Sequence, residues 1–140
     1  MSAAANEQAV RALYDAWNRR DLDGWVGAFT PDATWHNAPS GETFTGPDGM
    51  AQNYRNWDKP FPDGLCTEIE VLAAEDFAVG RFIARGVNSG PLAGPDGEVP
   101  ATGRSLAVPF CDVHRLRDGR ITSTDRYWDQ ASVDRALGLS

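Results

Sequence analysis

Two oppositely charged side chains, Asp112 and Arg126, stand in a predicted pair of strands at places where aliphatic residues would be usual. Asp118-Gly119 lies between the two strands, and this dipeptide between alternating apolar runs is the strongest short signal for a β-hairpin. Side chains alternate between the faces of a strand, so counting by twos from the turn gives the neighbours of each charged group. Phe110 and His114 share the face of Asp112, and Thr124 and Trp128 share the face of Arg126.

A carboxylate and a guanidinium on facing strands, beside a tryptophan, are typical of the floor of a polar pocket. A carboxyl group in an apolar cavity either stays neutral and donates a hydrogen bond to an oxyanion, or ionises and acts as a base. We therefore expect Asp112 to do acid–base chemistry. The structural alternative is an ion pair of Asp112 with Arg126 or Arg81 that only holds the strands together.

Composition argues against several classes of partner and cofactor. The net charge of -7 argues against nucleic acid, which requires a basic face, and against an anionic membrane surface. Cys66 and Cys111 lie far apart, and the histidines, His36 and His114, form no ligand motif. No nucleotide-binding, phosphate-binding or zinc-protease motif is present. We expect neither a metal nor a cofactor.

The length of 140 residues suits one domain, residues 1–140, with one hydrophobic core. No apolar run approaches the roughly 20 residues that cross a bilayer. The first ten residues lack the basic start and the apolar stretch of a secretory signal. We therefore expect a cytoplasmic protein.

Apolar spacing and turn residues predict the elements that must position the charged groups. Asp21 can cap a helix, and Pro47 can begin one. The predicted helices cover residues 7–19, 22–29, 47–57 and 130–137, and the predicted strands cover 33–38, 42–45, 67–74, 77–88, 104–117 and 120–129. Residues 58–65 and 89–103 are predicted loops. Three helices followed by a long meander indicate an α+β fold, a cone-shaped curved antiparallel sheet with N-terminal helices against one face and a cavity at its open end.

Several short motifs occur in a distinctive order. They are Asp21–Phe29 followed by PDATW, Phe61-Pro62-Asp63, Arg85–Gly90, Ala101–Arg104, Cys111–Arg115, Asp118–Ile121, and Tyr127–Asp129 with the tail to Leu139. Over nearly the whole chain this order resembles the SnoaL-like polyketide cyclases of the nuclear-transport-factor-2-like superfamily. The resemblance implies a cystatin-like α+β barrel, a homodimer through the outer sheet face, and an aldol ring closure without metal or cofactor. In that chemistry a carboxylate removes a proton α to a carbonyl, and polar groups hold the enolate oxygen.

The resemblance also implies roles for single residues. Asp112 matches the strand position at which ketosteroid isomerases carry an acid that hydrogen-bonds the enolate oxygen. Asn37 stands where those isomerases hold the catalytic base, and an amide cannot take that proton at neutral pH. In the cyclase branch an asparagine at this place resembles a substrate-binding group, and the alternative is a cap for local backbone. Asn88 stands where many members have a histidine.

Arg126 departs from the cyclase pattern, which has an aspartate base at this place. The acid of this chain, Asp125, is shifted by one residue, and such a shift turns a side chain to the other face of the sheet. Unless a bulge intervenes, Arg126 points into the pocket and Asp125 points away. We expect Arg126 to clamp a substrate carboxylate or phenolate, or to set the ionisation of Asp112. A structural pairing is the alternative.

Aromatic side chains are predicted to form most of the cavity wall. Asn88 and His114 are expected to complete it, although a lone histidine on a strand is more often structural. The chain has five tryptophans, and an aromatic cavity suits a flat, polycyclic or polyene substrate. The predicted aromatic wall consists of Tyr14, Trp17, Trp35, Tyr54, Trp57, Phe82, Phe110 and Trp128.

These features together favour a cofactor-independent cyclase that acts on a hydrophobic, polyketide-like molecule. Asp112 would do the acid–base work, while Arg126 and Asn37 would orient the substrate or stabilise an oxyanion. The alternatives are epoxide hydrolysis, isomerisation or hydroxylation on the same scaffold, and a protein that only binds a small molecule. A hydrolase requires a second acid in the pocket. A cavity in which Asp112 and Arg126 leave no polar group free would favour binding.

Overall fold

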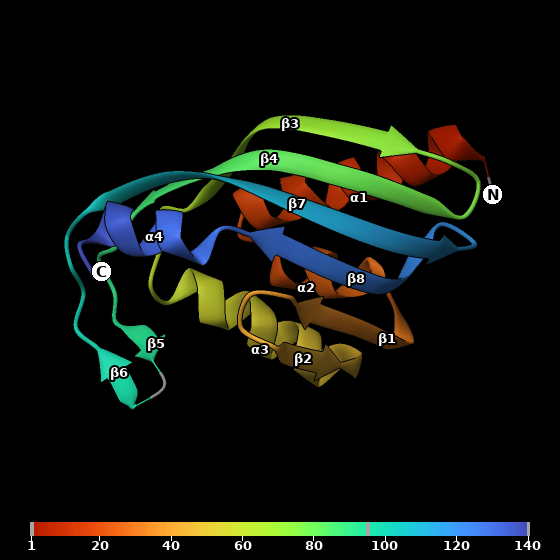
Figure 1. Ribbon diagram of the computed structural model, residues 1–140. Helices are drawn as coiled ribbons and strands as arrows, with labels where there is room; N and C mark the ends of the chain where they lie inside the picture. Colours follow the sequence, from red (N-terminus) through yellow and green to blue (C-terminus); the bar gives the residue numbers. More distant parts are fainter. Residues whose placement is uncertain (1, 95, 140) are drawn as a thin grey trace.

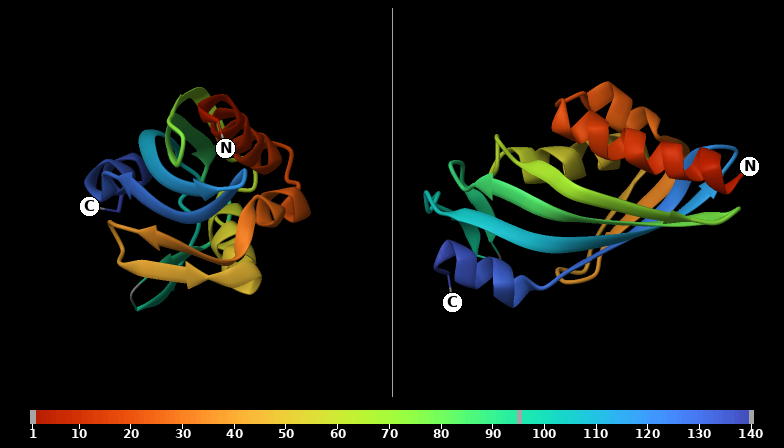
Figure 2. Two further views of the ribbon diagram at one scale, coloured as in Figure 1. Left: turned by 90° about the vertical axis from the view of Figure 1, so that its right-hand side faces the viewer. Right: turned by 90° about the horizontal axis from the view of Figure 1, so that it is seen from above.

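A curved six-stranded sheet, a separate two-stranded hairpin and four helices make up the computed structural model, which describes residues 2–94 and 96–139. The helices are α1 (Ala3–Asn18), α2 (Leu22–Gly27), α3 (Gly46–Asp58) and α4 (Gln130–Leu137). The strands of the main sheet are β1 (Phe29–Asn37), β2 (Glu42–Thr45), β3 (Leu65–Ala73), β4 (Phe77–Val87), β7 (Ser105–Arg117) and β8 (Arg120–Trp128). Their order is β2-β1-β8-β7-β4-β3, and α1 and α2 lie against the concave face (Figure 1 and Figure 2). The predicted α+β cone is thus confirmed as a curved sheet that does not close.

Local sequence explains where the helices begin and end. Ser2 Oγ accepts a hydrogen bond from the backbone N–H of Ala5 at the start of α1, and Asp21 caps α2 in the same way. Pro47 lies in the first turn of α3, where no N–H is needed. Gly138 ends α4 with a φ of 71°, in the left-handed region that favours glycine. The four predicted helices are confirmed, with small changes at their ends.

The hairpin between β7 and β8 has the predicted turn and the predicted faces. Asp118 and Gly119 have φ values of 53° and 78°, as a two-residue type I′ turn requires. The ladder places Asp112 opposite Arg126, and all of the side chains on this face except that of Trp128 are buried. The pairs on this face are Phe110–Trp128, Asp112–Arg126 and His114–Thr124.

The sheet also differs from the predicted antiparallel meander. β1 begins at Phe29, not at residue 33, and it continues through Pro31, whose missing N–H falls where the ladder to β8 shifts register. β1 pairs with β8 in parallel. These strands are not joined by a turn, so alternation alone cannot predict their relative direction. The predicted loop 89–103 contains the hairpin β5 (Leu92–Gly94) and β6 (Gly97–Val99), whose strands are too short for a periodic signal.

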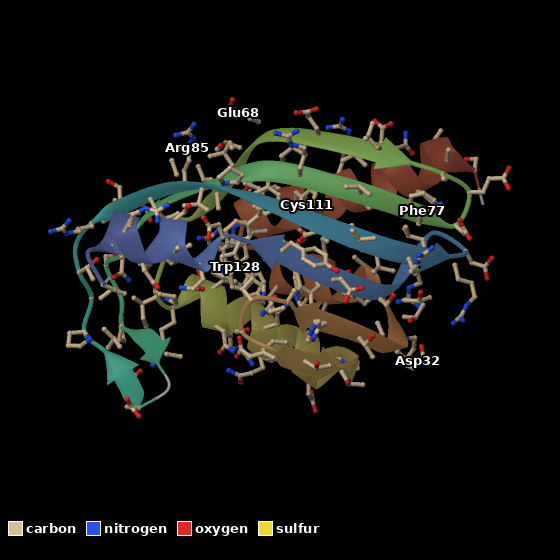
Figure 3. The ribbon with its side chains drawn as sticks, in the orientation of Figure 1. Asp32, Glu68, Phe77, Arg85, Cys111 and Trp128 are labelled. Atoms are coloured by element: carbon tan, nitrogen blue, oxygen red, sulfur yellow. The ribbon has the colours of Figure 1, made fainter. Side chains whose placement is uncertain are left out.

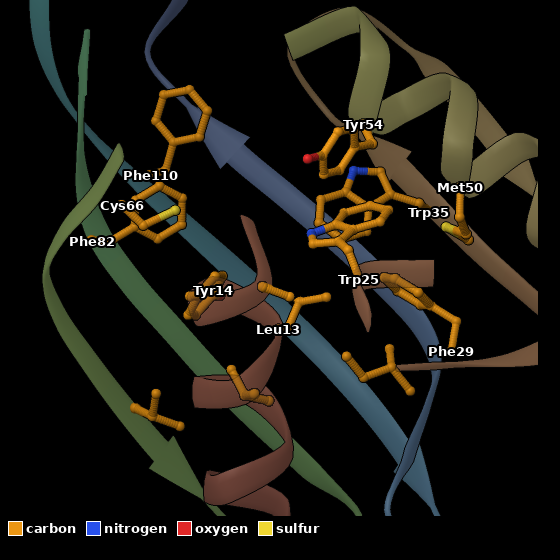
Figure 4. Close-up of a cluster of buried hydrophobic side chains, with 14 of the residues drawn as sticks. Leu13, Tyr14, Trp25, Phe29, Trp35, Met50, Tyr54, Cys66, Phe82 and Phe110 are labelled. Carbon is orange, nitrogen blue, oxygen red and sulfur yellow. The ribbon is translucent and has the colours of Figure 1, made fainter. Parts of the chain in front are cut away.

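The core lies between α1 and the concave face of the sheet. Figure 4 shows Tyr14 of α1 beside Phe82 and Cys66, with Trp25 and Trp35 on the other side of Leu13. All six side chains are buried. Within the described residues, no helix combines the length and the apolar character needed to cross a membrane.

Candidate functional site

Arg126 and Asp112 form a two-point ion pair on the concave face of the sheet. Arg126 Nε donates to Asp112 Oδ1 over 2.7 Å, and Nη2 donates to Oδ2 over 2.9 Å. Asp112 is fully buried and Arg126 is 9% exposed. Asp125 lies on the opposite face, paired with Val113, and Arg126 points inward as expected. The ladder does shift register between Arg115 and Leu116, and this shift leaves Arg126, not Asp125, opposite Asp112.

The Tyr14 hydroxyl reaches the same carboxylate from α1. Its Oη donates to Asp112 Oδ2 over 2.9 Å. The tyrosine passes over Gly80, which pairs with Asp112 in the β4–β7 ladder. A Cβ atom at residue 80 would lie 2.2 Å from Tyr14 Oη. A glycine inside this strand is therefore what allows the helix side chain to meet the sheet.

A chain of hydrogen bonds continues from Tyr14 through His114 to Thr124. His114 Nε2 lies 3.1 Å from Tyr14 Oη, and His114 Nδ1 lies 2.7 Å from Thr124 Oγ1. The only hydrogen of the Tyr14 hydroxyl goes to Asp112, so His114 must donate from Nε2 and accept at Nδ1. The donors then run in one direction, from Thr124 to His114, to Tyr14 and to Asp112.

Burial sets the charge states of this network. Desolvation lowers the pKa of His114 to about 4, so the ring is neutral at pH 7. Desolvation and the charge of Asp112 raise the pKa of Tyr14 well above its usual value. Burial alone would lower the pKa of Arg126, but the Asp112 carboxylate raises it through its charge and its hydrogen bonds. Around the Asp112–Arg126 ion pair, Tyr14 and His114 are therefore neutral at pH 7.

Four aromatic rings surround the guanidinium of Arg126. Its central carbon lies 4.6 Å from the ring centroid of Trp35. The centroids of Phe110, Phe82 and Trp57 follow at 5.3, 5.5 and 5.9 Å. Aromatic faces attract cations, so these rings favour the charged guanidinium. Among the described residues Nη1 has no hydrogen-bond partner, so a charged donor remains for a ligand.

The inner cavity has a volume of about 70 Å³ and is lined by Arg126. Tyr14, Tyr54, Cys66 and the exposed Arg85 are the other titratable groups on its wall, and no carboxylate of the described residues lines it. Burial raises the pKa of Cys66 to about 12, so the thiol stays protonated. The cavity therefore offers a ligand the buried cation of Arg126, the exposed cation of Arg85 and neutral donors.

The outer pocket has a volume of about 420 Å³ and shares Trp57, Phe61 and Val133 with the inner cavity. Asn37 and Trp128 also line it, together with residues of β5. Asn37 Oδ1 accepts a hydrogen bond of 2.9 Å from Trp35 Nε1. Trp35 in turn stacks on Arg126, so it connects Asn37 with the ion pair.

Apart from Asn88, the predicted site residues fall into three groups, and Trp57 lines both spaces. Asn37 and Trp128 line the outer pocket. Asp112, His114 and Trp35 line neither space and lie behind the wall, in contact with residues that do. The predicted residues on the wall of the inner cavity are Tyr14, Trp17, Tyr54, Trp57, Phe82, Phe110 and Arg126.

Asn88 lines neither space, because the chain itself occupies its amide. Nδ2 donates to the carbonyl oxygens of Pro60 and Gly90, over 3.1 and 2.8 Å. Oδ1 accepts from the backbone N–H and the hydroxyl of Thr102, over 2.8 and 2.9 Å. In place of the expected substrate contact, Asn88 joins both ends of the segment that carries β5 and β6.

Sequence reasoning missed several contributors to the site, among them Gly80, Thr124, Cys66 and Phe61. Gly80 had a signal, since a glycine inside a strand pattern marks a close approach. Thr124 was on the right face, but its bond to His114 follows only from three-dimensional distances. Cys66 and Phe61 line the inner cavity. Phe61 belongs to one of the motifs of the resemblance but was not assigned to the site, and Cys66 has no pattern of its own. Among the residues that the structure describes, no group of three or more His, Cys, Asp or Glu side chains could hold a metal ion.

Comparisons with known proteins agree with this architecture. The model of the SnoaL-like domain family matches residues 10–124. TsrD from Streptomyces laurentii has 26% identity and a TM-score of 0.84, over 100% of this chain and 99% of that one. IdmH from Streptomyces antibioticus, a proposed polyketide cyclase, has 26% identity and a TM-score of 0.79, over 95% and 98%.

A proposed SnoaL-like polyketide cyclase from Jannaschia sp. CCS1 has 23% identity and a TM-score of 0.86, over 99% of this chain and 94% of that one. A hypothetical protein from Catenulispora acidiphila, at 23% identity and a TM-score of 0.79, has the ketosteroid isomerase-like fold; the match spans 94% of this chain and 93% of that one. A search of curated proteins found no match. The curved sheet with its N-terminal helices has the fold of these solved structures. Because the family model matches residues 10–124, most of the chain, this protein belongs to the SnoaL-like family.

Proposed function

We propose that the protein is a cofactor-independent cyclase that closes a ring in a hydrophobic poly-β-carbonyl molecule. The observation that carries this proposal is Arg126, a buried cation on the cavity wall that is held by Asp112 and keeps a donor free. A fixed cation in an aromatic cavity stabilises an enolate oxygen as its charge develops. The family match and the likeness to IdmH, a proposed polyketide cyclase, support the same reaction class.

The proposed step needs no strong base on the protein. A methylene group between two carbonyls is acidic. When one of these carbonyl oxygens accepts a hydrogen bond from Arg126, the methylene carbon loses a proton to water, and the carbonyl oxygen becomes the enolate oxygen. The enolate carbon attacks a carbonyl carbon of the same chain and a C–C bond forms. The electron pair of that C=O bond moves to its oxygen, which takes a proton from water. Asp112 acts through Arg126 as a positioning residue.

Binding without catalysis is the second candidate. The observation in its favour is that Asp112 is fully paired and no carboxylate of the described residues lines the inner cavity. Epoxide hydrolysis is less well supported for the same reason, since a carboxylate must activate the attacking water.

Ring closure of 1,7-diphenylheptane-1,3,5,7-tetraone, followed by absorbance, tests the proposal. The protein should accelerate closure, and Arg126→Met should lower kcat/KM by roughly 10²-fold, as removal of an oxyanion donor does. Arg81→Met, an exposed arginine on the other face, is the matched control and should keep full activity. Tight binding without acceleration would favour the binding protein, and acceleration that survives Arg126→Met would overturn the role of Arg126.

We further propose a homodimer through the convex face of the sheet. This face points to the reader in Figure 3, where Phe77 and Cys111 are labelled. Its apolar side chains are exposed or half-buried in the single chain and form the cross-strand pairs Val79–Val113, Ile83–Pro109 and Cys111–Tyr127. Sedimentation equilibrium should give the mass of two chains, and Val113→Glu should give the mass of one.

A further inference from the structure

The inner cavity is too small for the large substrate that its aromatic wall suggests. Its volume is about 70 Å³, whereas sites for drug-sized ligands enclose roughly 300–1,000 Å³. The neighbouring outer pocket, with about 420 Å³, has that size. A larger molecule whose reacting carbonyl lies against Arg126 must therefore extend beyond the inner cavity. Two pockets share part of its wall, the outer pocket and one of about 490 Å³ at Leu65, Arg85 and Leu106. The outer pocket suits an apolar carbonyl chain better, because Trp57, Trp128 and the amide of Asn37 line it.

The two spaces share three wall residues, two of which are aromatic. Trp57, Phe61 and Val133 line both of them. Trp57 packs edge-on against Trp128 of the outer pocket, with centroids 5.2 Å apart and an angle of 81° between the rings. The same indole lies 5.9 Å from the guanidinium carbon of Arg126. A flat, conjugated chain that passes from one space to the other therefore contacts aromatic surface along its length.

Asn37 offers the outer pocket an unpaired donor. An indole N–H can only donate, so the atom that faces Trp35 Nε1 must be the oxygen of Asn37, and its NH₂ group points elsewhere. Asn37 is only 2% exposed, yet among the described residues Nδ2 has no hydrogen-bond partner. Asn37 Nδ2 is not among the atoms that are both unpaired and completely enclosed by the protein. Because Asn37 lines the outer pocket, this nitrogen is available to a ligand there.

Arg126 and Asn37 are direct neighbours across the β1–β8 ladder. Paired strands lie about 4.8 Å apart, and both side chains are on the concave face. One strand therefore supplies a charged donor to the inner cavity, and the next supplies a neutral donor to the outer pocket. This spacing suits two oxygens of one chain that spans both spaces.

We propose that the outer pocket is a second ligand compartment for the remainder of the molecule that reacts at Arg126, with Asn37 Nδ2 donating to a carbonyl oxygen of that remainder. This inference rests on the proposed function and adds the shape of the substrate. The substrate is an extended polycarbonyl chain with an aromatic or apolar head, not a compact ring system. The β5–β6 hairpin closes the compartment through Leu92, and its Glu98 forms an ion pair with Lys59, the residue that follows α3.

Two probes that differ by one carbonyl-bearing arm test this inference by isothermal titration calorimetry. Benzoylacetone represents the head alone, and N-butyl-3,5-dioxo-5-phenylpentanamide adds an amide arm. The extended probe should bind about tenfold more tightly. Ala93→Trp, on the exposed wall of the outer pocket, should remove this gain and leave the affinity for benzoylacetone unchanged. Ala101→Trp, an exposed residue of the same segment that lines neither space, is the matched control.

The indole N–H signals of the five tryptophans give a second readout in the unaltered protein. Trp17 and Trp25 line only the inner cavity, and Trp128 lines only the outer pocket. Benzoylacetone should shift the first two signals, and the extended probe should also shift that of Trp128. Equal affinities for the two probes, or an unchanged Trp128 signal, would overturn the second compartment alone. Failure of benzoylacetone to bind at all would contradict the role of Arg126 and remove both proposals.

Discussion

Arg126 and Asp112 are joined across β7 and β8 by hydrogen bonds of 2.7 and 2.9 Å, and this pair separates a buried side of the site from a ligand side. On the buried side, Tyr14 and His114 complete the network around the carboxylate. On the ligand side, Arg126 lines the cavity. Desolvation largely offsets the attraction within a buried ion pair. The main effect of the pair is therefore to hold a charge in an apolar cavity.

Tyr14→Phe should destabilise the fold by about 1–3 kcal/mol, since it leaves the Nε2–H of His114 buried without an acceptor. Urea unfolding measures the change in the free energy of unfolding. Tyr54→Phe is the matched control, because the Tyr54 hydroxyl has no hydrogen bond to the described residues and its loss should cost less than about 0.5 kcal/mol. Equal losses in the two variants would contradict the network.

His114 should make the protein less stable in acid. The pKa of the ring is about 4 in the folded protein and about 6.5 in an unfolded chain. The unfolded chain binds the proton first, so this contribution is complete above pH 6.5 and is lost as the pH falls from 6.5 to 4. The loss amounts to about 3 kcal/mol.

Denaturant unfolding at several pH values checks this dependence. The stability of His114→Gln should depend less on pH between 7 and 4.5 than that of the unaltered protein. His36→Gln, on the partly exposed face of β1, is the control and should keep the pH dependence of the unaltered protein. The same pH dependence in all three proteins would show that His114 is not the responsible group.

Gly80→Ala should displace the Tyr14 ring, because its Cβ would lie 2.2 Å from Tyr14 Oη and 2.7 Å from Cε2. Overpacking of this kind costs about 1–3 kcal/mol. Thermal unfolding should show the loss, and a Tyr14→Leu background should reduce it. Gly27→Ala, where no atom lies within 4 Å of the added Cβ, serves as the control. A loss of equal size in the leucine background would mean that the strand backbone, not the tyrosine, resists the change.

The strongest local signals predicted the part of the site that lies on one hairpin. The Asp118-Gly119 turn located the hairpin, and alternation by twos gave the residues that share a face within each strand. An unbroken ladder from this turn would pair Asp112 with Asp125. The ladder shifts by one residue between Arg115 and Leu116, and this irregularity sets Asp112 opposite Arg126. Periodicity assigns residues to faces and does not choose partners between elements. The bond from Tyr14 to Asp112, which joins residues 98 positions apart, therefore came only from the structure.

The same limit explains two further differences. Asn88 was expected at the pocket because of its place in a motif, but its amide meets the chain at Pro60 and Thr102, which no local pattern indicates. The small volume of the inner cavity also depends on how large side chains interlock. Trp57, Phe110 and Trp128 line the two spaces as predicted, but their rings also pack against one another and leave little room in the inner cavity.

The pH profile of ring closure by Asp112→Asn tests the central claim most directly. Asparagine keeps an oxygen for Arg126, so a positioning role predicts a loss in kcat/KM of about tenfold and a profile of unchanged shape, while Arg126→Met loses roughly 10²-fold. A loss of about 10⁴-fold in Asp112→Asn, with the disappearance of the acidic limb of the profile, would identify Asp112 as the general base and contradict this account.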